Sequence, residues 1–166
     1  LAPKAGLNDS RLWWHGAHYA LWGRHQQMDR LTSIYRKDLK YYKPKAKAQG
    51  YEGVRWPKTL GDHARWEWPN EINPLLIWQQ PHPIIFAELD YRSNPNQQTI
   101  DKWKDVVSQT ADFMASYPYY NKRENRYILG YPLQVVSENA NPSTTINPTF
   151  ELSYGRTGLR IAQLWR

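Results

Sequence analysis

Glu138 is the carboxylate in this sequence whose neighbours best suit chemistry. It stands in VSENANPSTTINPTFEL, residues 136–152, where an apolar extended run gives way to a loop of Asn, Pro, Ser and Thr. A general acid needs a carboxyl group that stays protonated near neutral pH, and apolar walls or a second carboxylate can provide this. The amide and hydroxyl side chains nearby can bind a polyol. Glu138 is therefore a candidate general acid, and a carboxylate that only caps the loop is the alternative.

Glycoside hydrolysis requires a second group besides the acid. In inverting enzymes the two carboxyl groups lie roughly 6.5–9.5 Å apart, so that a water molecule fits between the base and the sugar. Glu151 stands at the start of an expected helix and could orient the Glu138 loop. The other local candidates are Asp62, Glu67 and Glu71. None of the four is singled out as the base, but Glu67 and its neighbour Trp66 are candidate sugar contacts from a ring-rich stretch.

Three histidines near the N-terminus raise the question of a metal site. His15, His18 and His25 lie at spacings of three and seven, and they would share one helical face if a helix continued through Gly23. The stretch lacks the HExxH pattern and a carboxylate ligand, so histidines that line a cleft or the core are favoured over metal ligands. We assign His15 and His18 as candidate sugar contacts, and we expect neither a metal nor another cofactor.

The composition is rich in rings that carry a polar group. Nine Trp and twelve Tyr accompany only three Phe, which suits half-apolar surfaces that stack on sugars, although most of these rings should fill a helical core. The absence of cysteine excludes disulfides and thiolate metal sites. No apolar run approaches the length of a membrane span, and no Gly-rich phosphate loop or nucleophile elbow is present.

The net charge of +7 makes an acidic partner worth considering. The basic residues gather in one stretch near the end of an expected helix, where the helix dipole favours cations. They are Arg36, Lys37, Lys40, Lys43, Lys45 and Lys47. A solvated helical face explains them best, so our expected partners include no nucleic acid and no membrane, and nucleic-acid binding through this helix stays a weak alternative.

The periodicity predicts an all-α chain of about five helices with long aromatic loops and at most a short β-hairpin. The first half of the chain should contain a helix from 8–10 to Gly23, a helix from His25 to Gln49 with an irregularity at Pro44, and a loop over 51–73. An apolar helical stretch at 75–78 should follow, which Pro81 and Pro83 break before it resumes at 84–91. After a turn at 94–96 we expect a helix over 100–117, an extended segment or hairpin at 127–136, and a last helix with Pro148 at its first position.

Five segments resemble, in order, the six-hairpin or (α/α)6-toroid glycosidases, most nearly the branch around glycoside hydrolase family 95. They are LWWHGAHYALWGR, GYEGVRWPK, INPLLIWQQPHPIIFAELDYR, TADFMASYPYY and VVSENANPSTTINPTFELSYGRTGL, and together they cover nearly the whole chain. The most specific element is Ser-Glu-Asn followed by Asn-Pro-Thr-Phe-Glu, because such enzymes place their general acid in a similar step.

This resemblance implies an inverting glycosidase with Glu138 as the general acid. It also implies that Asn139 shapes the acid loop, that Glu151 supports the helix entry behind it, and that Arg55 and Trp56 belong to a Trp-Pro loop lining the sugar site. The fucosidase members carry an Asn-rich step where this sequence reads His-Gly-Ala-His at 15–18, which argues against α-L-fucosidase specificity.

The family's base lies on a later hairpin, and a full toroid needs about twice the helices expected here. We therefore expect residues 1–166 to be one unit, an incomplete arc of a catalytic domain that lacks turnover alone and whose partners are a carbohydrate and the remainder of that domain. A secreted or periplasmic location would suit polysaccharide degradation. The alternative function is a carbohydrate-binding or scaffold module of the same fold without catalysis.

Overall fold

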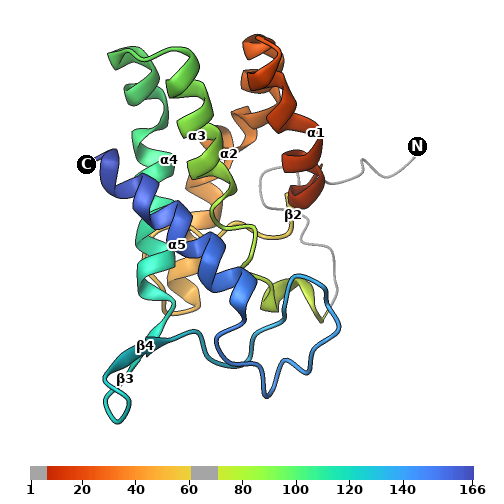
Figure 1. The fold of residues 1–166 in the computed structure, drawn as a ribbon, viewed down its shortest axis with the longest axis vertical. Helices are drawn as coiled ribbons and strands as arrows, with labels where there is room; N and C mark the ends of the chain where they lie inside the picture. Colours follow the sequence, from red (N-terminus) through yellow and green to blue (C-terminus); the bar gives the residue numbers. More distant parts are fainter. Residues whose placement is uncertain (1–6, 61–70) are drawn as a thin grey trace.

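The computed structural model describes residues 7–60 and 71–166 (Figure 1). Over these ranges the chain is mostly helical, which confirms the all-α prediction. The elements are β1 (Leu7–Asn8), α1 (Asp9–Leu21), α2 (His25–Ala48), β2 (Thr59–Leu60), the 3-10 helix η2 (Asn73–Leu75), α3 (His82–Ser93), α4 (Gln97–Ser116), β3 (Tyr119–Asn121), β4 (Arg126–Ile128) and α5 (Thr149–Leu164).

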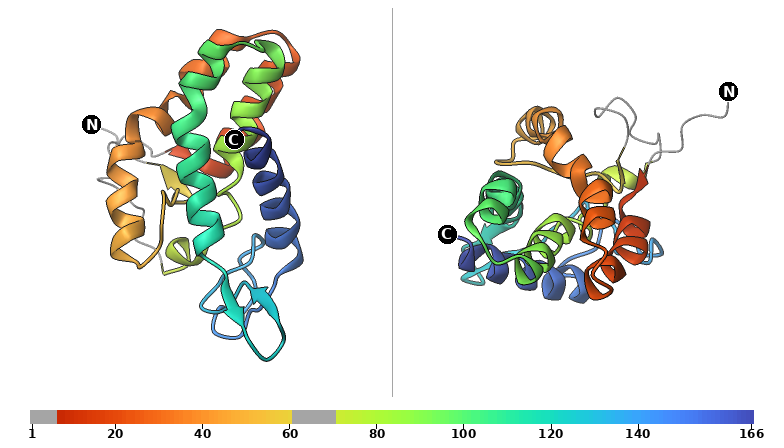
Figure 2. Two further views of the ribbon diagram at one scale, coloured as in Figure 1. Left: turned by 90° about the vertical axis from the view of Figure 1, so that its left-hand side faces the viewer. Right: turned by 90° about the horizontal axis from the view of Figure 1, so that it is seen from above.

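The helices form two successive hairpins, with a fifth helix laid across one face. α1 packs on α2, α3 packs on α4, and α1 and α2 also contact α3. α5 runs obliquely across α3 and α4, while the segments that connect β4 to α5 lie at the lower end of the molecule (Figures 1 and 2). The helices therefore form one body, and the 129–148 segment extends from one end of it.

Helix α2 buries a stripe of side chains at three- and four-residue spacing. Met28, Thr32, Tyr35, Tyr42 and Ala46 are all buried, as an amphipathic helix requires. The turn before it uses Gly23, whose positive φ of 66° suits glycine. The helix continues through Pro44 to Ala48, so the expected irregularity does not end it.

Helix α4 begins directly after the predicted turn at 94–96. The Asn96 side chain accepts a hydrogen bond from the Thr99 backbone N–H at 2.9 Å, which satisfies one of the free donors of the first turn. Farther along, Trp103 is fully buried and its indole N–H donates to the Asp90 carboxylate of α3 at 2.7 Å. This bond links the second hairpin through its core.

The prediction of a helical stretch at 75–78 is wrong. Only the 3-10 helix Asn73–Leu75 forms, and Leu76 is extended and pairs with Gln134. Pro81 caps α3 and Pro83 lies in its first turn, where the missing N–H costs nothing. The two prolines therefore begin a helix instead of interrupting one. In the same way Pro148 caps α5, one residue before the position expected for it.

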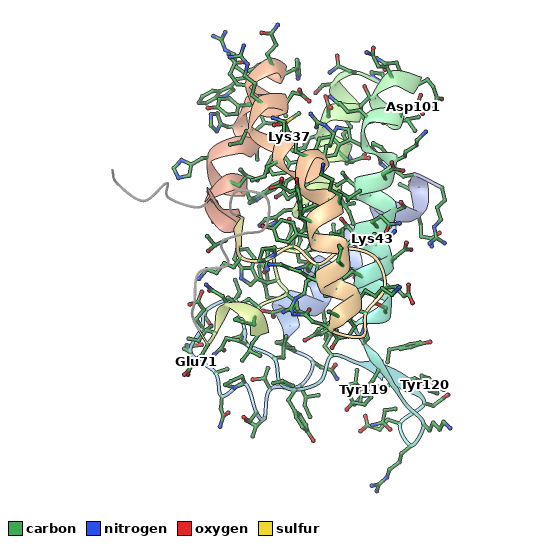
Figure 3. All side chains as sticks on the ribbon, turned by 180° about the vertical axis from the view of Figure 1, so that it is seen from behind. Lys37, Lys43, Glu71, Asp101, Tyr119 and Tyr120 are labelled. Carbon is green, nitrogen blue, oxygen red and sulfur yellow. The ribbon has the colours of Figure 1, made fainter. Side chains whose placement is uncertain are left out.

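The predicted short hairpin is present but lies earlier than expected. β3 pairs with β4 in antiparallel register, with Tyr119 opposite Ile128 and Asn121 opposite Arg126. The hairpin extends from the lower end of the molecule (Figure 1), and Figure 3 shows Tyr119 and Tyr120 on it. A second antiparallel pair joins β1 to β2.

The main core lies between the two hairpins and is aromatic. Tyr35, Trp56, Phe86, Trp103 and Phe113 are all fully buried in it. Edge-to-face contacts join Trp56 to Tyr35, with ring centroids 5.0 Å apart. The loop after α2 is drawn onto this core, because the Val54 backbone N–H donates to the Gln109 carbonyl of α4 at 2.8 Å. In the part of the chain that the structure describes, no helix combines the length and apolarity needed to cross a membrane.

Candidate functional site

Glu138 lies in the loop between β4 and α5 in an unusual backbone conformation. Its φ is +58°, in the left-handed region that residues other than glycine seldom adopt. Its backbone N–H donates to the Val135 carbonyl at 2.9 Å and closes a tight turn. Its side chain is 31% exposed, so the carboxylate is accessible from solvent. Strained residues of this kind concentrate at functional sites, although the geometry alone does not define the chemistry.

The Glu138 carboxylate forms an ion pair with Lys58. The Lys58 ammonium contacts Glu138 Oε1, and the Lys58 side chain is 18% exposed. Lys58 belongs to the Arg-Trp-Pro-Lys stretch, so the pair joins the two loops that the sequence assigned to the sugar site. A general acid must place its carboxyl oxygen against the leaving group, and the Lys58 ammonium already contacts Oε1 of Glu138. This contact is the strongest constraint on any mechanism that uses Glu138.

Hydrogen bonds within the Glu138 loop and to the segments beside it hold the loop in place. The Gln134 backbone N–H donates to the Leu75 carbonyl, and its side chain donates to the Ala140 carbonyl at 3.0 Å. At the far end Asn147 and Leu129 exchange two hydrogen bonds of 2.9 Å. Asn139, assigned to shape the acid loop, accepts a hydrogen bond from the Ser137 hydroxyl at 2.6 Å. The loop is thus fixed at both ends.

Glu151 supports this loop from behind. It lies in the first turn of α5, is only 5% exposed, and its Oε1 accepts the Val136 backbone N–H at 2.7 Å. Burial raises the pKa of the Glu151 carboxyl. Its other oxygen, Oε2, is buried without a hydrogen-bond partner among the described residues. Glu151 therefore orients the segment before Glu138, as the sequence suggested.

Trp56 and Arg55 hold the Trp-Pro loop in place. Trp56 is fully buried, and its indole N–H donates to the Thr110 hydroxyl at 2.9 Å. The sequence-based assignment of this ring as a sugar contact does not fit that placement, because the apolar core already covers the indole. Arg55 donates to the Gln49 side chain at 2.8 Å and to the Pro74 carbonyl. Arg55 thereby ties the end of α2 to η2.

The histidines assigned as sugar contacts lie on α1, which Figures 1 and 2 show above the 129–148 segment that carries Glu138. His15 is exposed, and His18 packs against Tyr19 and Trp22 with centroid distances of 4.3 and 4.7 Å. His25 begins α2, and the break at Gly23 that the sequence predicts separates it from the other two, so the condition for a shared helical face is not met. Among the described residues no group of three or more His, Asp or Glu side chains has a metal-binding arrangement.

Several candidates cannot be placed. Asp62, Trp66 and Glu67 lie outside the described residues. Glu71 is described and exposed, at the lower end of the molecule where the Glu138 loop also lies (Figure 3). Of the four carboxylates weighed as a second group, Glu151 is the one with a direct contact to the Glu138 loop in the described part of the chain.

The sequence analysis missed the polar residues of the Trp-Gln-Gln-Pro-His stretch. The Gln79 and Gln80 side chains both donate to the Trp56 carbonyl, and Gln80 also accepts from the Trp56 N–H at 3.0 Å. Three polar side chains in five residues, within an otherwise apolar stretch, were the available signal, because polar groups that are buried are almost always hydrogen-bonded. Gln79 and Gln80 fix the Trp-Pro loop that carries Lys58.

His82 of the same stretch lies at the centre of an aromatic cluster. Its ring stacks on Trp13 with centroids 5.6 Å apart, and its Nδ1 lies 2.8 Å from the Tyr154 hydroxyl. Trp78 approaches the same ring edge-on at 5.3 Å. Burial lowers the pKa of His82 to about 3, so the imidazole is neutral at physiological pH.

Comparison with known proteins adds no assignment to this geometry. No family model matches the chain, and no curated protein matches it.

Proposed function

We propose that this chain is part of an inverting glycoside hydrolase in which Glu138 is the general acid. The observation that carries the proposal is the pairing of Lys58 with Glu138, which joins the Trp-Pro loop to the Glu138 loop around a partly exposed carboxylate. The two helical hairpins α1–α2 and α3–α4, followed by α5, would form an arc of an (α/α)6 toroid. The carboxylate that activates water is assigned to residues outside this chain.

In this mechanism Glu138 transfers a proton to the oxygen of the leaving group as the glycosidic bond breaks. Water attacks the anomeric carbon from the opposite face, and the base takes its proton. Because the Lys58 ammonium contacts Oε1 of Glu138, Lys58 must leave this oxygen before it can serve the leaving group. We infer that a sugar hydroxyl takes up the Lys58 ammonium on binding, which frees Oε1 for the leaving group.

The loop scaffold supports the same assignment. Glu151 accepts the Val136 N–H before Glu138, and the Gln134 side chain donates to the Ala140 carbonyl after it, so hydrogen bonds within the protein hold the backbone on either side of Glu138. A catalytic acid needs this kind of fixed support, since misplacement by about 1 Å can cost 100-fold in rate. Gln79 and Gln80 give Lys58 comparable support through Trp56.

The test uses a protein that contains this chain together with the proposed base. Wild type and Glu138→Gln are assayed on a panel of oligosaccharides, and NMR follows the configuration of the sugar released. We expect inversion and at least about a 100-fold loss of kcat in the variant. Glu124→Gln, which changes an exposed glutamate on the β3–β4 hairpin, is the matched control and should keep full activity. Full activity in Glu138→Gln would contradict the proposal.

A carbohydrate-binding module without catalysis is the second candidate, and the ion pair is the observation that favours it. A carboxylate and an ammonium held side by side can bind sugar hydroxyls, the first by accepting and the second by donating hydrogen bonds, with no reaction needed. Calorimetry of the 166-residue chain with the same oligosaccharides would detect such binding. Binding without hydrolysis by the longer protein, even though its base is intact, would support this candidate over the first.

Nucleic-acid binding is a weaker third candidate. Lys37, Lys40, Lys43 and Lys47 are exposed along α2, and Figure 3 shows Lys37 and Lys43 on that helix. Binding through them would weaken steeply with added salt, because bound counterions are released from the phosphates. Oligonucleotide binding by the chain that does not change between low and physiological salt would exclude it.

A further inference from the structure

A groove of about 390 Å³ lies between α4, α5 and the base of the β3–β4 hairpin. It lies on the side of the molecule where α4 and α5 run past each other, seen in the left view of Figure 2. Its volume is in the range of sites that bind small organic molecules. Neither Glu138 nor Lys58 lines the groove, so it is separate from the candidate catalytic pair.

Most of the groove wall is apolar. Phe113 and Met114 contribute from α4, Trp78 from the segment before α3, and Leu152 and Leu159 from α5. Leu152 is 42% exposed, so part of this apolar wall is in contact with water. A hydrocarbon body laid in the groove would remove that surface from water, which is favourable. The groove therefore suits a ligand that is apolar over most of its length.

One side of α5 gives the groove a positively charged edge. Arg156 and Arg160 line the groove one helical turn apart, beside Leu152 and Leu159. The opposite side of the helix faces the protein interior, where Ala162 is buried. Residues four apart on a helix are neighbours, with Cβ atoms roughly 5–6 Å apart. Two guanidinium groups at this spacing can both contact one anionic group.

The two arginines lack the acidic partners that other arginines of this protein have. Arg36, Arg92 and Arg126 each form an ion pair with a carboxylate. Arg156 and Arg160 are exposed, and neither has an ion pair in the part of the chain that the structure describes. Guanidinium groups bind carboxylates through charge-assisted hydrogen bonds. The charge at this edge of the groove therefore complements an anionic group and repels a cationic one.

Glu151 is the acidic residue among the described residues that line the groove, and it lies away from this edge along the helix. It precedes Arg156 by five residues and Arg160 by nine, which places it about 7 and 13 Å from them along the helix axis. Its Oε1 already accepts the Val136 N–H. The anionic end of a ligand therefore belongs beside the C-terminal half of α5, and its apolar body extends toward Leu152.

We propose that this groove binds an apolar anion of the fatty-acid type. Its carboxylate pairs with Arg156 and Arg160, and its hydrocarbon body covers the apolar wall. The complementarity between the arginine pair and a carboxylate selects this class of ligand. Binding here does not depend on glycoside hydrolysis, because neither Glu138 nor Lys58 takes part. The site can therefore be refuted while the proposed function stands, and the reverse also holds.

The test compares decanoate, decan-1-ol and decylammonium as ligands of the 166-residue chain, each below its solubility limit and below the concentration at which micelles form. The three share a hydrocarbon body and differ in the charge of the head group. NMR titration follows the backbone amides of α5. We expect decanoate to bind several-fold to about tenfold more tightly than decan-1-ol, and decylammonium to bind more weakly than either. The preference for decanoate should shrink as salt is added.

Three outcomes of this comparison would overturn the proposal. Equal binding of the three ligands would remove the role of charge, and tighter binding of decylammonium would reverse it. Displacement of decanoate by an equal concentration of acetate would reveal an anion site that does not need the apolar wall.

Variants at the two arginines test the pairing. Arg156→Gln/Arg160→Gln should remove the preference for decanoate over decan-1-ol and leave the binding of decan-1-ol unchanged. Lys122→Gln/Arg123→Gln is the matched control, because it removes the same charge from exposed positions that do not line the groove. This control should keep the preference. A preference that persists in Arg156→Gln/Arg160→Gln would contradict the assignment of the carboxylate to these arginines.

Variants at Gly155 test the location. A Cβ at Gly155 would meet only Met114 Cε, at 3.8 Å, so the backbone tolerates a side chain there. Gly155→Leu should fill the groove and abolish the binding of decanoate and decan-1-ol, while Gly155→Ala should keep it. Unchanged binding by a folded Gly155→Leu, checked by circular dichroism, would contradict the location. A dimer that Gly155→Leu dissociates, in a chain that does not bind decanoate, would assign the groove to a second copy and would also overturn the proposal.

Discussion

The ammonium of Lys58 rests against the carboxylate of Glu138, 80 residues away along the chain. Lys58 is fixed by a loop that Trp56 anchors in the core, and Glu138 by a loop that Glu151 anchors at α5. Two irregular segments are thereby brought to one place by buried groups on either side. The pair defines the point where the proposed chemistry has to occur.

The Lys58–Glu138 pair should contribute only modestly to stability. Both side chains are partly exposed, and such pairs are worth about 0.2–1 kcal/mol. A double-mutant cycle with Lys58→Met and Glu138→Gln, measured by urea unfolding, should give a coupling free energy in this range that shrinks as salt is added. A coupling free energy of several kcal/mol would mean that the pair is structural and would weaken the functional interpretation.

Glu151→Gln should alter the pH dependence of stability in one direction. Burial raises the folded-state pKa of Glu151 above its ordinary value of 4.5, so the favourable contribution of the protonated carboxyl is complete below pH 4.5. It is lost as the pH rises through the folded-state pKa, with a slope below about 1.4 kcal/mol per pH unit. The glutamine can still accept the Val136 N–H.

The stability difference between wild type and Glu151→Gln should therefore become less favourable to wild type from pH 4.5 upward. Urea unfolding of both proteins across this range measures it. A difference that is constant with pH would contradict the raised pKa. Glu124→Gln controls for the loss of one surface carboxylate.

His82 should make the protein less stable in acid. Its folded-state pKa of about 3 lies below the ordinary value of 6.5. The neutral imidazole therefore makes its full contribution to the free energy of unfolding above pH 6.5, and this contribution is lost as the pH falls toward 3. The expected slope is up to about 1.4 kcal/mol per pH unit. His82→Phe should remove this slope and cost about 1–3 kcal/mol at pH 7 through the lost bond to Tyr154. His15→Phe, at an exposed position of α1, should leave the slope intact. An unchanged slope in His82→Phe would mean that other groups cause the acid sensitivity.

Gly53 should be far less tolerant of alanine than Gly50. Both have positive φ, 65° and 85°, so alanine is strained by about 1–2 kcal/mol at either position. A Cβ at Gly53 would also lie 2.0 Å from the Gln109 carbonyl oxygen, whereas nothing lies within 4 Å at Gly50. Gly53→Ala should therefore lose at least about 2 kcal/mol more than Gly50→Ala in urea unfolding. Equal losses would show that the loop does not pack on α4 as described.

Periodicity predicts the helices of this chain well, because each buries an apolar stripe and its caps are local. The asparagine cap of α4 and Gly50, which follows α2 with a positive φ, are examples, since both depend on residues within one turn. The helix predicted at 75–78 is wrong because a contact far along the chain decides the structure of this stretch. Its apolar residues suit a buried extended segment as well as a helix, and the pairing of Leu76 with Gln134 decides between them.

The candidate site likewise has features that the local sequence predicts and features that depend on contacts far along the chain. The Glu138 loop is recognisable from its residues, and the support from Glu151 follows from its place at a helix start. The pairing with Lys58 and the burial of Trp56 depend on contacts across more than fifty residues, to Glu138 and to Thr110, and no local pattern encodes them. His15 and His18 were assigned by type and spacing alone, which is why the fold could separate them from the loop.

The dependence of hydrolysis on the leaving group tests the role of Glu138 most directly. A general acid matters most for a poor leaving group, and a 2,4-dinitrophenyl group departs without protonation. In the longer protein, Glu138→Gln should lose at least about 100-fold in kcat on an unactivated oligosaccharide, and should lose little on the corresponding 2,4-dinitrophenyl glycoside. Equal losses on both substrates, or no loss on either, would contradict the assignment of Glu138 as the acid.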